Sequence, residues 1–452
     1  MNRLRALVVT ASCACAPTAL PTSAPRADCS DADAVDVVDH AIDLQLAFDP
    51  PSLAGRGVIR VVARREAHAV VLDAHALQIS EVASDAGALH FTHTDGRLCV
   101  DLPRPMAAGV TTSLHIAWNA AVDRSTPRFA GAQVWAGYDA AAWMPTRHDP
   151  AQRATLALRL TAPSVASVTA SGRLVSRTPR DDGTTTHSFA IDRPSPPFLY
   201  AFAAGRFAAA ELDVDGVTLR ALGPPHANLA GALAITAPML RFLRDHVGPP
   251  PSNEYTQVFV KGDAAQEAAG FALLSANALE DVRNDPTEDW IFSHELAHQW
   301  FAWLVPCADF ADFWLNEGFA TFLTAAIKEE RWGRAAYERE LRLWCQRSAK
   351  VHADGRDAPL SLSSPSAPAR RPPREAELQA RGVTYARGAL VLHKLRTELG
   401  DAVFWAGVRR YVSDRAGKSA RTEDLRRAFE AASGRDLRGF FDRWVYAAAA
   451  DL

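Results

Sequence analysis

The segment WIFSHELAHQW, residues 290–300, carries side chains whose types and spacing suit metal-dependent hydrolysis. His294 and His298 are four residues apart, so on an α-helix they lie on one face, about one turn apart, and can bind one ion. Glu295 points to the side of that pair, where it could reach a water molecule on the ion more easily than the ion itself. Two histidines leave the site incomplete, because catalytic zinc takes three protein ligands and keeps a fourth position for water.

Glu317 is the candidate for the third ligand. It follows His298 by 19 residues in the segment FWLNEGFATF, a gap long enough for one helix to end, the chain to reverse and a second helix to pack antiparallel. Its neighbours are apolar, and a carboxylate in such surroundings is costly to bury without a cation or another partner. A single zinc ion held by His294, His298 and Glu317 would remove that cost. This third residue disfavours the alternative, a solvated helix face that contains the motif by coincidence.

The elements that must position these residues begin with a long β region. Apolar residues occupy alternate positions in AIDLQLAF (41–48) and in ATLALRL (154–160), as in half-buried strands, and Gly, Asp and Pro separate such runs. We therefore expect an N-terminal β-sheet domain over residues 28–212.

The remainder, residues 213–452, is expected to be mostly helical. LAGALAITAPMLRFLRDHVG predicts a helix that ends near Gly248, and EYTQVFVKG predicts a strand. Residues 359–375 are rich in Pro, Ser and Arg and predict a flexible surface loop. Helices are expected again from about Tyr385, and TEDLRRAFEAASG predicts one that ends at Gly434.

Two helices should carry the candidate ligands. Asp285, Pro286 and Glu288 have the pattern of a helix start with a capping box, which would open the helix that bears the two histidines. A second helix is predicted from about Asp312 to Glu330, and Gly333 should lie just beyond its end.

Composition excludes several classes of partner. The chain has 452 residues, of which 48% are hydrophobic and 22% charged, as in a soluble globular protein of two or three domains. Its net charge of −3 argues against a nucleic-acid or anionic-membrane partner. No apolar run reaches the roughly 18 residues that a transmembrane helix requires.

The N-terminus has the features of an export signal over residues 1–27. A basic start, MNRLR, precedes the apolar run ALVVTASCACA, and residues 14–16 fit a small-x-small cleavage site. We therefore expect a periplasmic or extracellular protein. A lipid anchor at Cys13 or Cys15 is an alternative, but the usual preceding leucine is absent. The cysteines that remain after cleavage allow disulfides, whose pairing the sequence leaves open.

With these residues in view, the chain resembles the aminopeptidase N family, which are zinc metalloaminopeptidases of the gluzincin type. The resemblance lies in HELAHQWF followed by WLNEGFA, in YARGALVLHKL (385–395), and in WMPTRHDPAQRATLALRL of the β region. It implies an α+β multidomain fold, with an N-terminal antiparallel β domain before a thermolysin-like α/β zinc peptidase domain that ends in a helical bundle. Many members continue into a further helical domain. This short form would leave its cleft open, or close it with a second subunit in a homo-oligomer.

The resemblance also implies roles for individual residues. Glu295 would be the general base towards the attacking water, and Tyr385 would donate a hydrogen bond to the tetrahedral oxyanion. Glu267 would bind the free α-amine of the substrate, although its segment departs from the Gly-x-Met-Glu-Asn pattern: Ala264, Gln266 and Ala268 replace Gly, Met and Asn. These departures put exopeptidase specificity in doubt more than zinc hydrolysis.

Other polar residues are weaker candidates. Gln133 lies one position from where the family supplies a glutamine to the amine site, so we assign it no role. His148 replaces a usual Asp and is interpreted as structural. His226 and His246 have no ligand spacing and are expected in the surface or core.

The sequence thus predicts a zinc-dependent aminopeptidase that acts on short peptides. Two alternatives stay open: a zinc endopeptidase or specialised amidase on the same scaffold, and a non-catalytic binding protein of this fold. The preferred N-terminal residue, the oligomeric state and the physiological substrate cannot be read from the sequence.

Overall fold

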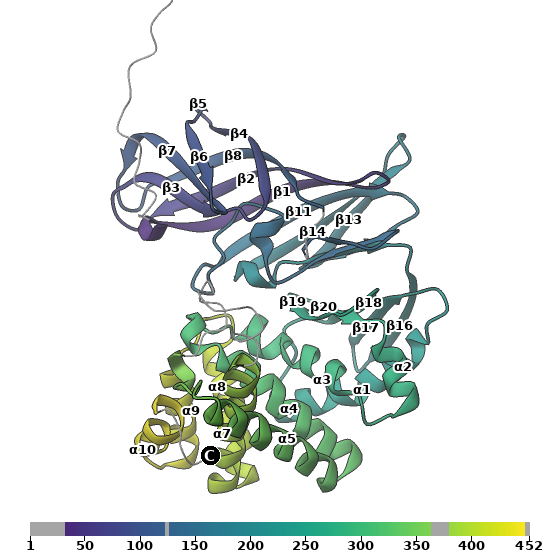
Figure 1. Cartoon of the computed structure of the whole chain (residues 1–452), viewed down its shortest axis with the longest axis vertical. Coiled ribbons are helices and arrows are strands. Elements are labelled where there is room, and N and C mark those ends of the chain that lie inside the picture. Colours follow the sequence, from purple (N-terminus) through teal and green to yellow (C-terminus); the bar gives the residue numbers. More distant parts are fainter. Residues whose placement is uncertain (1–31, 123–125, 363–378, 448–452) are drawn as a thin grey trace, which may run out of the picture.

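The computed structural model describes residues 32–122, 126–362 and 379–447. The β domain lies at the top of Figure 1, and below it lies a second domain in which a sheet and helices pack together. The predicted leader over residues 1–27 and residues 363–375 of the predicted loop lie outside the described residues. Within the described ranges, no helix combines the length and the apolarity needed to cross a membrane.

The predicted alternation of buried and exposed positions is confirmed in the β domain. Ile42, Leu44 and Leu46 of β1 (Val35–Phe48) are buried, as are the three alternate leucines of β11 (Ala154–Pro163). The buried faces of these strands pack into one apolar core. The alternation of apolar and polar residues therefore correctly predicted which face of each of these two strands packs into the core.

The described strands of the β domain form three sheets. The largest runs in the order β13-β14-β11-β1-β2-β8-β4-β5, and the others in the orders β12-β15-β10-β9 and β3-β7-β6. Their further members are β2 (Pro51–Ala63), β3 (Ala67–Asp73), β4 (Leu77–Ser84), β5 (Gly87–Ala88), β6 (Phe91–Thr94), β7 (Arg97–Met106), β8 (Thr111–Ala120), β9 (Arg128–Phe129), β10 (Gln133–Ala136), β12 (Ser167–Ala170), β13 (Arg173–Pro179), β14 (Thr184–Ser195) and β15 (Phe202–Gly205).

The predicted fold class is confirmed with one difference in the β domain. β1 and β11 pair in parallel, so the largest sheet is mixed rather than antiparallel throughout. A parallel pair needs a long connection, and the strands between β1 and β11 supply one. Alternating apolar positions fix the buried face of a strand but do not fix the direction of its neighbour.

A separate sheet belongs to the second domain. It runs in the order β16-β17-β18-β20-β19, and its strands are β16 (Ala208–Val214), β17 (Val217–Gly223), β18 (Glu254–Val260), β20 (Phe271–Ser275) and β19 (Ala265–Ala268). β17, β18 and β20 are parallel, and α1 (Leu229–His246) makes the crossover between the first two. The expected boundary after residue 212 falls within β16, which pairs with this sheet.

The two domains share an apolar contact that fixes the end of this sheet. Trp135 and Ala203 of the β domain pack with Val258, Phe271 and Leu273 in one buried cluster. The edge strand β19 lies beside this contact, because it pairs with β20. The position of β19 therefore depends on both domains.

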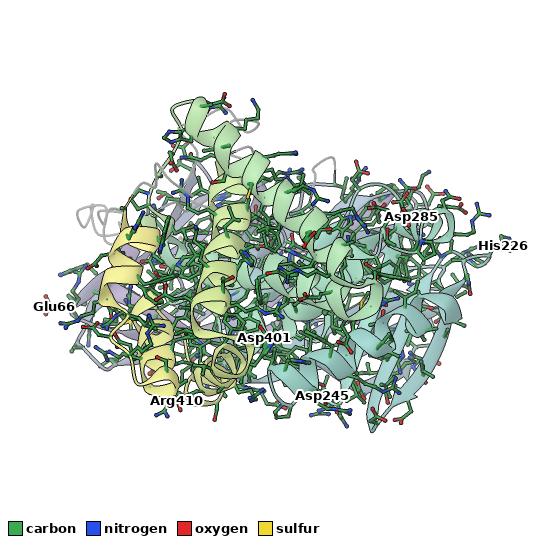
Figure 2. All side chains as sticks on the ribbon, turned by 90° about the horizontal axis from the view of Figure 1, so that it is seen from below. Glu66, His226, Asp245, Asp285, Asp401 and Arg410 are labelled. Carbon is green, nitrogen blue, oxygen red and sulfur yellow. The ribbon has the colours of Figure 1, made fainter. Side chains whose placement is uncertain are left out.

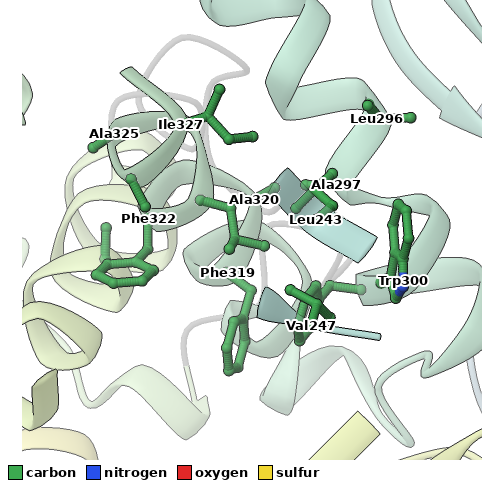
Figure 3. Packing of buried hydrophobic residues seen from close by; sticks show 14 of the residues in the cluster. Leu243, Val247, Leu296, Ala297, Trp300, Phe319, Ala320, Phe322, Ala325 and Ile327 are labelled. Atoms are coloured by element: carbon green, nitrogen blue, oxygen red, sulfur yellow. The ribbon is translucent and has the colours of Figure 1, made fainter. Parts of the chain in front are cut away.

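The helices of the second domain have the bounds α2 (Ala278–Asn284), α3 (Trp290–Ala297), α4 (Trp314–Trp332), α5 (Arg334–Ala353), α7 (Gly388–Leu399), α8 (Asp401–Arg415), α9 (Thr422–Ser433) and α10 (Arg438–Phe441). Figure 3 shows Leu243 of α1, Ala297 of α3 and Phe319 of α4 in one packed interior. α3 is buried almost all round, as expected of a helix with little polar surface outside its functional residues. The predicted helices that end near Gly248, Gly333 and Gly434 are confirmed.

The predicted start of the histidine-bearing helix at Asp285 is wrong. Asp285 ends α2, where its carboxylate accepts hydrogen bonds from the backbone N–H and hydroxyl of Thr287, and α3 begins only at Trp290. The aspartate lies at the periphery of the molecule (Figure 2). An aspartate beside a proline favours a turn as much as a helix cap, and the turn is the outcome here.

Candidate active site

The candidate zinc ligands meet where α3 packs against α4. His294 lies in the last turn of α3, His298 ends that helix, and Glu317 lies in the first turn of α4. All three side chains are buried, and one ligand atom from each lies within 4.8 Å of the others. The structure thus brings together the three residues that the sequence selected.

Their separations suit one tetrahedral ion. Oε2 of Glu317 lies 3.3 Å from Nε2 of His294 and 3.6 Å from Nε2 of His298. Ligand atoms about 2.1 Å from a tetrahedral ion stand roughly 3.4 Å apart. Both separations from Glu317 therefore fit a tetrahedral zinc ion, and the two histidine nitrogens lie within 4.8 Å of each other.

The ring of His298 is oriented by a hydrogen bond at Nδ1, the nitrogen that does not face Glu317. Its Nδ1 lies 3.1 Å from the backbone carbonyl of Phe301. This carbonyl can only accept, so Nδ1 keeps a proton, and Nε2, which faces Glu317, is the nitrogen that would offer a lone pair to a metal ion once its own proton is displaced. The chain makes the contact by leaving α-helical geometry immediately after His298, in the irregular turn Gln299–Leu304.

Two further carboxylates lie beside the ligands. Oxygens of Glu267, on β19, and of Glu295, on α3, lie within 4.8 Å of a ring nitrogen of His298 and of each other. Oε1 of Glu267 and Oε2 of Glu295 are buried and have no hydrogen-bond partner. Buried acceptors without donors are costly, which indicates that this space takes a cation or a donor from substrate or water.

The electrostatics of the cluster favour a cation. Burial raises the pKa of Glu267 to about 7 and that of Glu295 well above its usual range. Burial would also raise the pKa of Glu317, but His298 and His294 outweigh it and lower that pKa to about 2. Burial would lower the pKa of His298, yet the surrounding carboxylates outweigh it and raise the pKa to about 10. A potential that holds a proton so firmly can hold a divalent ion in its place.

Tyr385 lies against His294. Its ring stacks on that of His294, with centroids 6.0 Å apart and planes 9° apart. Burial, and then the charge of Glu317, raise the pKa of the phenol well above its usual range. Tyr385 therefore keeps its proton at neutral pH and can donate a hydrogen bond.

A contact between two glycines brings Tyr385 to the ligands across 68 residues of sequence. A Cβ on Gly388 would lie 2.9 Å from the Cα of Gly318, and one on Gly318 would lie 3.0 Å from Gly388. Gly318 directly follows Glu317, and Gly388 lies one helical turn after Tyr385. Only residues without side chains allow this approach, so the pair fixes the phenol relative to the carboxylate.

The remaining candidates from the sequence lie elsewhere. Gln133 accepts a hydrogen bond from the backbone N–H of Lys261 at the domain contact. His148 is packed edge-on against Tyr138, and its backbone N–H is bound by Asp73. His226 is exposed at the periphery (Figure 2), and His246 stacks on the side chain of Phe242.

Sequence reasoning missed two residues that position the site. Gln299 accepts a hydrogen bond from the backbone N–H of Gly270 and donates one to the carbonyl of Ala268, both at 3.1 Å, so it links the end of α3 to the strand that bears Glu267. Arg387 is buried and pairs with Asp357 beside the Tyr385 turn. In the sequence, the only indication of a role was that Gln299 follows HELAH and that Arg387 lies close to Tyr385. That these side chains connect separate elements is visible only in the folded structure.

Comparison with known proteins agrees with this geometry. Residues 262–444 match the Peptidase family M1 domain. Aminopeptidase N of Streptomyces lividans is 31% identical over 221 residues, which cover 45% of this chain and 24% of the relative. Aminopeptidase N of Oryctolagus cuniculus is 28% identical over 336 residues, which cover 68% of this chain and 34% of the relative. The chain thus spans about a quarter to a third of these curated relatives.

Solved structures match over nearly the whole chain. An M1 zinc metallopeptidase from Deinococcus radiodurans has a TM-score of 0.73 and 27% identity, with 93% of this chain and 95% of that chain covered. A mutant M1 zinc metallopeptidase from the same organism, bound to a Tyr-Ser-Ala substrate, has the same TM-score and 26% identity. These matches confirm the predicted resemblance and the two-domain fold.

Proposed function

Because the chain carries a domain of peptidase family M1, we propose that it is a zinc-dependent aminopeptidase that removes the first residue of short peptides. The observation that carries the proposal is the convergence of His294, His298 and Glu317 at separations that suit one zinc ion, with the free carboxylate oxygens of Glu295 and Glu267 beside them.

Zinc, when bound by these three residues, would polarise the scissile carbonyl and increase the acidity of the attacking water. Glu295 is the residue to accept the proton of that water, because an oxygen of its carboxylate lies within 4.8 Å of a ring nitrogen of His298. Glu295 would then deliver that proton to the leaving amine. The tetrahedral oxyanion would accept a hydrogen bond from Tyr385, which stays protonated beside His294.

Glu267 would select the N-terminus of the substrate. A carboxylate placed beside the ligands pairs with an α-ammonium and sets the cut at the first peptide bond. The buried, unpartnered Oε1 of Glu267 supports this role, because burial leaves it few other donors.

A panel of aminoacyl fluorogenic substrates, each free and N-acetylated, tests the proposal with and without chelator. We expect cleavage of the free substrates only, loss of activity with chelator, and recovery with one equivalent of zinc. Glu295→Gln should lower kcat by about a thousandfold or more while zinc content stays near one ion per chain. Full activity of that variant would exclude Glu295 as the base.

A second candidate is an endopeptidase or amidase on the same scaffold. Ala264 and Ala268 flank Glu267 where the family has Gly and Asn, and this altered segment favours the alternative. Equal cleavage of free and acetylated substrates would establish it over the aminopeptidase.

We also propose export, on the basis of the basic start and apolar run in residues 1–27. Recovery of the processed protein from the periplasm or medium, with N-terminal sequencing, would test this. An uncleaved N-terminus in the cytoplasmic fraction would exclude it.

A further inference from the structure

Gln266 makes a direct contact with the carboxylate that faces the candidate metal ligands. Its Nε2 donates a hydrogen bond to Oε2 of the adjacent Glu267, at 2.5 Å. Neighbouring side chains of a strand point to opposite faces, so such a contact needs room at a sheet edge. β19 supplies that room, because it is the last strand of its sheet.

The β domain limits where the Gln266 side chain can go. A Cβ on Gly137, just after β10, would lie 3.0 Å from Cγ of Gln266 and 3.2 Å from Cδ1 of Leu273. Gln266 and Leu273 are partners across the β19–β20 pair. The backbone of the β domain at Gly137 therefore packs closely on the stem of Gln266, and a side chain at Gly137 would press against it.

The two oxygens of Glu267 are consequently unequal. Oε2 is occupied by the amide of Gln266, whereas Oε1 is buried without a partner. Only 5% of Glu267 is exposed, so water compensates the free oxygen little. A carboxylate fixed through one oxygen presents the other in a single direction, and such preorganisation favours one charged donor in one position.

We propose that Gln266 is a positioning residue, which orients the carboxylate of Glu267 towards the primary α-ammonium of the substrate. The backbone of the β domain at Gly137 would in turn restrict the position of the Gln266 side chain. The inference rests on the proposed aminopeptidase function and deepens it. It assigns the discrimination between free and blocked N-termini to a glutamine–glutamate pair on β19.

Gln266→Met is the decisive variant, because methionine keeps the length of the side chain and removes its donor. We expect KM for free aminoacyl substrates to rise about tenfold, as for loss of one hydrogen bond to a charged group, with kcat within about twofold of the parent. Zinc content and thermal midpoint should stay unchanged. Gln78→Met, at an exposed position on β4, is the matched control and should alter neither constant.

A double-mutant cycle separates action through Glu267 from a general structural role. In a Glu267→Gln background, Gln266→Met should change KM by less than about twofold, because the charged partner has gone. An undiminished tenfold effect in that background, or an unchanged KM in the single variant, would overturn the inference while leaving the aminopeptidase proposal intact. If the parent protein cleaves free and acetylated substrates equally, both proposals fall together.

Discussion

His40 and His298 are both fully buried, yet their surroundings give them opposite protonation states. His40 lies in β1 of the β domain, where Nε2 is 3.0 Å from the hydroxyl of Thr146 and burial lowers its pKa to about 4. His298 lies among the carboxylates of Glu317, Glu267 and Glu295, which outweigh burial and raise its pKa to about 10. At neutral pH the first ring is uncharged, and the second keeps a proton until a metal ion replaces it.

The difference shows that burial of a histidine does not by itself indicate a site. The hydrogen-bond partner of His40 is the neutral hydroxyl of Thr146, and the single nearby carboxylate, that of Asp39, does not outweigh the effect of burial on its pKa. Around His298 the acidic groups outnumber what two imidazoles can neutralise, and two of their oxygens have no donor. An excess of buried carboxyl groups with unpartnered oxygens marks the binding site, and the contrast with His40 can be tested by changing the acidic ligand, the hydrogen-bond donor, the packing and the titrating group in turn.

Removal of Glu317 should have the largest effect. Glu317→Ala removes both a ligand and a negative charge, so zinc affinity should fall by about a thousandfold or more, since loss of outer-shell partners alone costs 10–100-fold. Elemental analysis after dialysis should show little metal, and activity should be lost with it. Glu330→Ala, at an exposed position near the other end of α4, should keep both. Retention of zinc by the Glu317 variant would disprove the ligand assignment.

Tyr385→Phe should have the next largest effect. The ring can still stack on His294, but the hydrogen bond to the oxyanion is lost, and kcat should fall by about a hundredfold or more. KM and zinc content should change little, because the phenol is assigned to the transition state rather than to binding. Tyr446→Phe, which lies at the surface, is the control. A change confined to KM would show that Tyr385 binds substrate instead.

The parts of the molecule that were predictable from sequence depend on short-range patterns. The spacing of His294 and His298, and the alternate leucines of β11, follow from the helix and strand repeats themselves. Glu317 was found because an acidic residue in an apolar helix requires a partner.

The features that could not be predicted from the sequence depend on contacts between distant segments. The relation of Gln266 to Glu267 depends on Gly137 from the other domain, and no local pattern indicates it. The same holds for Gly318 and Gly388, since a glycine is compatible with many roles until its neighbour is known. The prediction of a helix start at Asp285 was wrong for a different reason. Its local sequence pattern is compatible with both a turn and a helix cap, so the pattern alone could not distinguish them.

The glycine contact gives the third prediction, on packing rather than charge. Gly388→Ala would place a methyl group against the Cα of Gly318, so the free energy of unfolding should fall by about 2–3 kcal/mol. kcat should fall as well, because Tyr385 and Glu317 are held by this contact. Gly439→Ala has open space around it and should not destabilise the protein. Urea unfolding and kinetics of both variants test this, and equal stability of the two would mean that the helices separate without cost.

The smallest effect concerns the pH dependence of stability in the β domain. The pKa of His40 is about 4 in the folded chain and about 6.5 when unfolded, so between these values only the unfolded chain takes up the proton. Stability from this group is complete above pH 6.5 and decreases towards pH 4, with a loss of about 2 kcal/mol between pH 7 and pH 5. His40→Gln cannot titrate, so its stability should fall less over that interval. Burial lowers the pKa of His187 to about 4 as well, so part of the slope should persist in the variant. Urea unfolding at both pH values measures the difference, and parallel losses in parent and variant would show that His40 does not carry the charge difference on which the comparison with His298 depends.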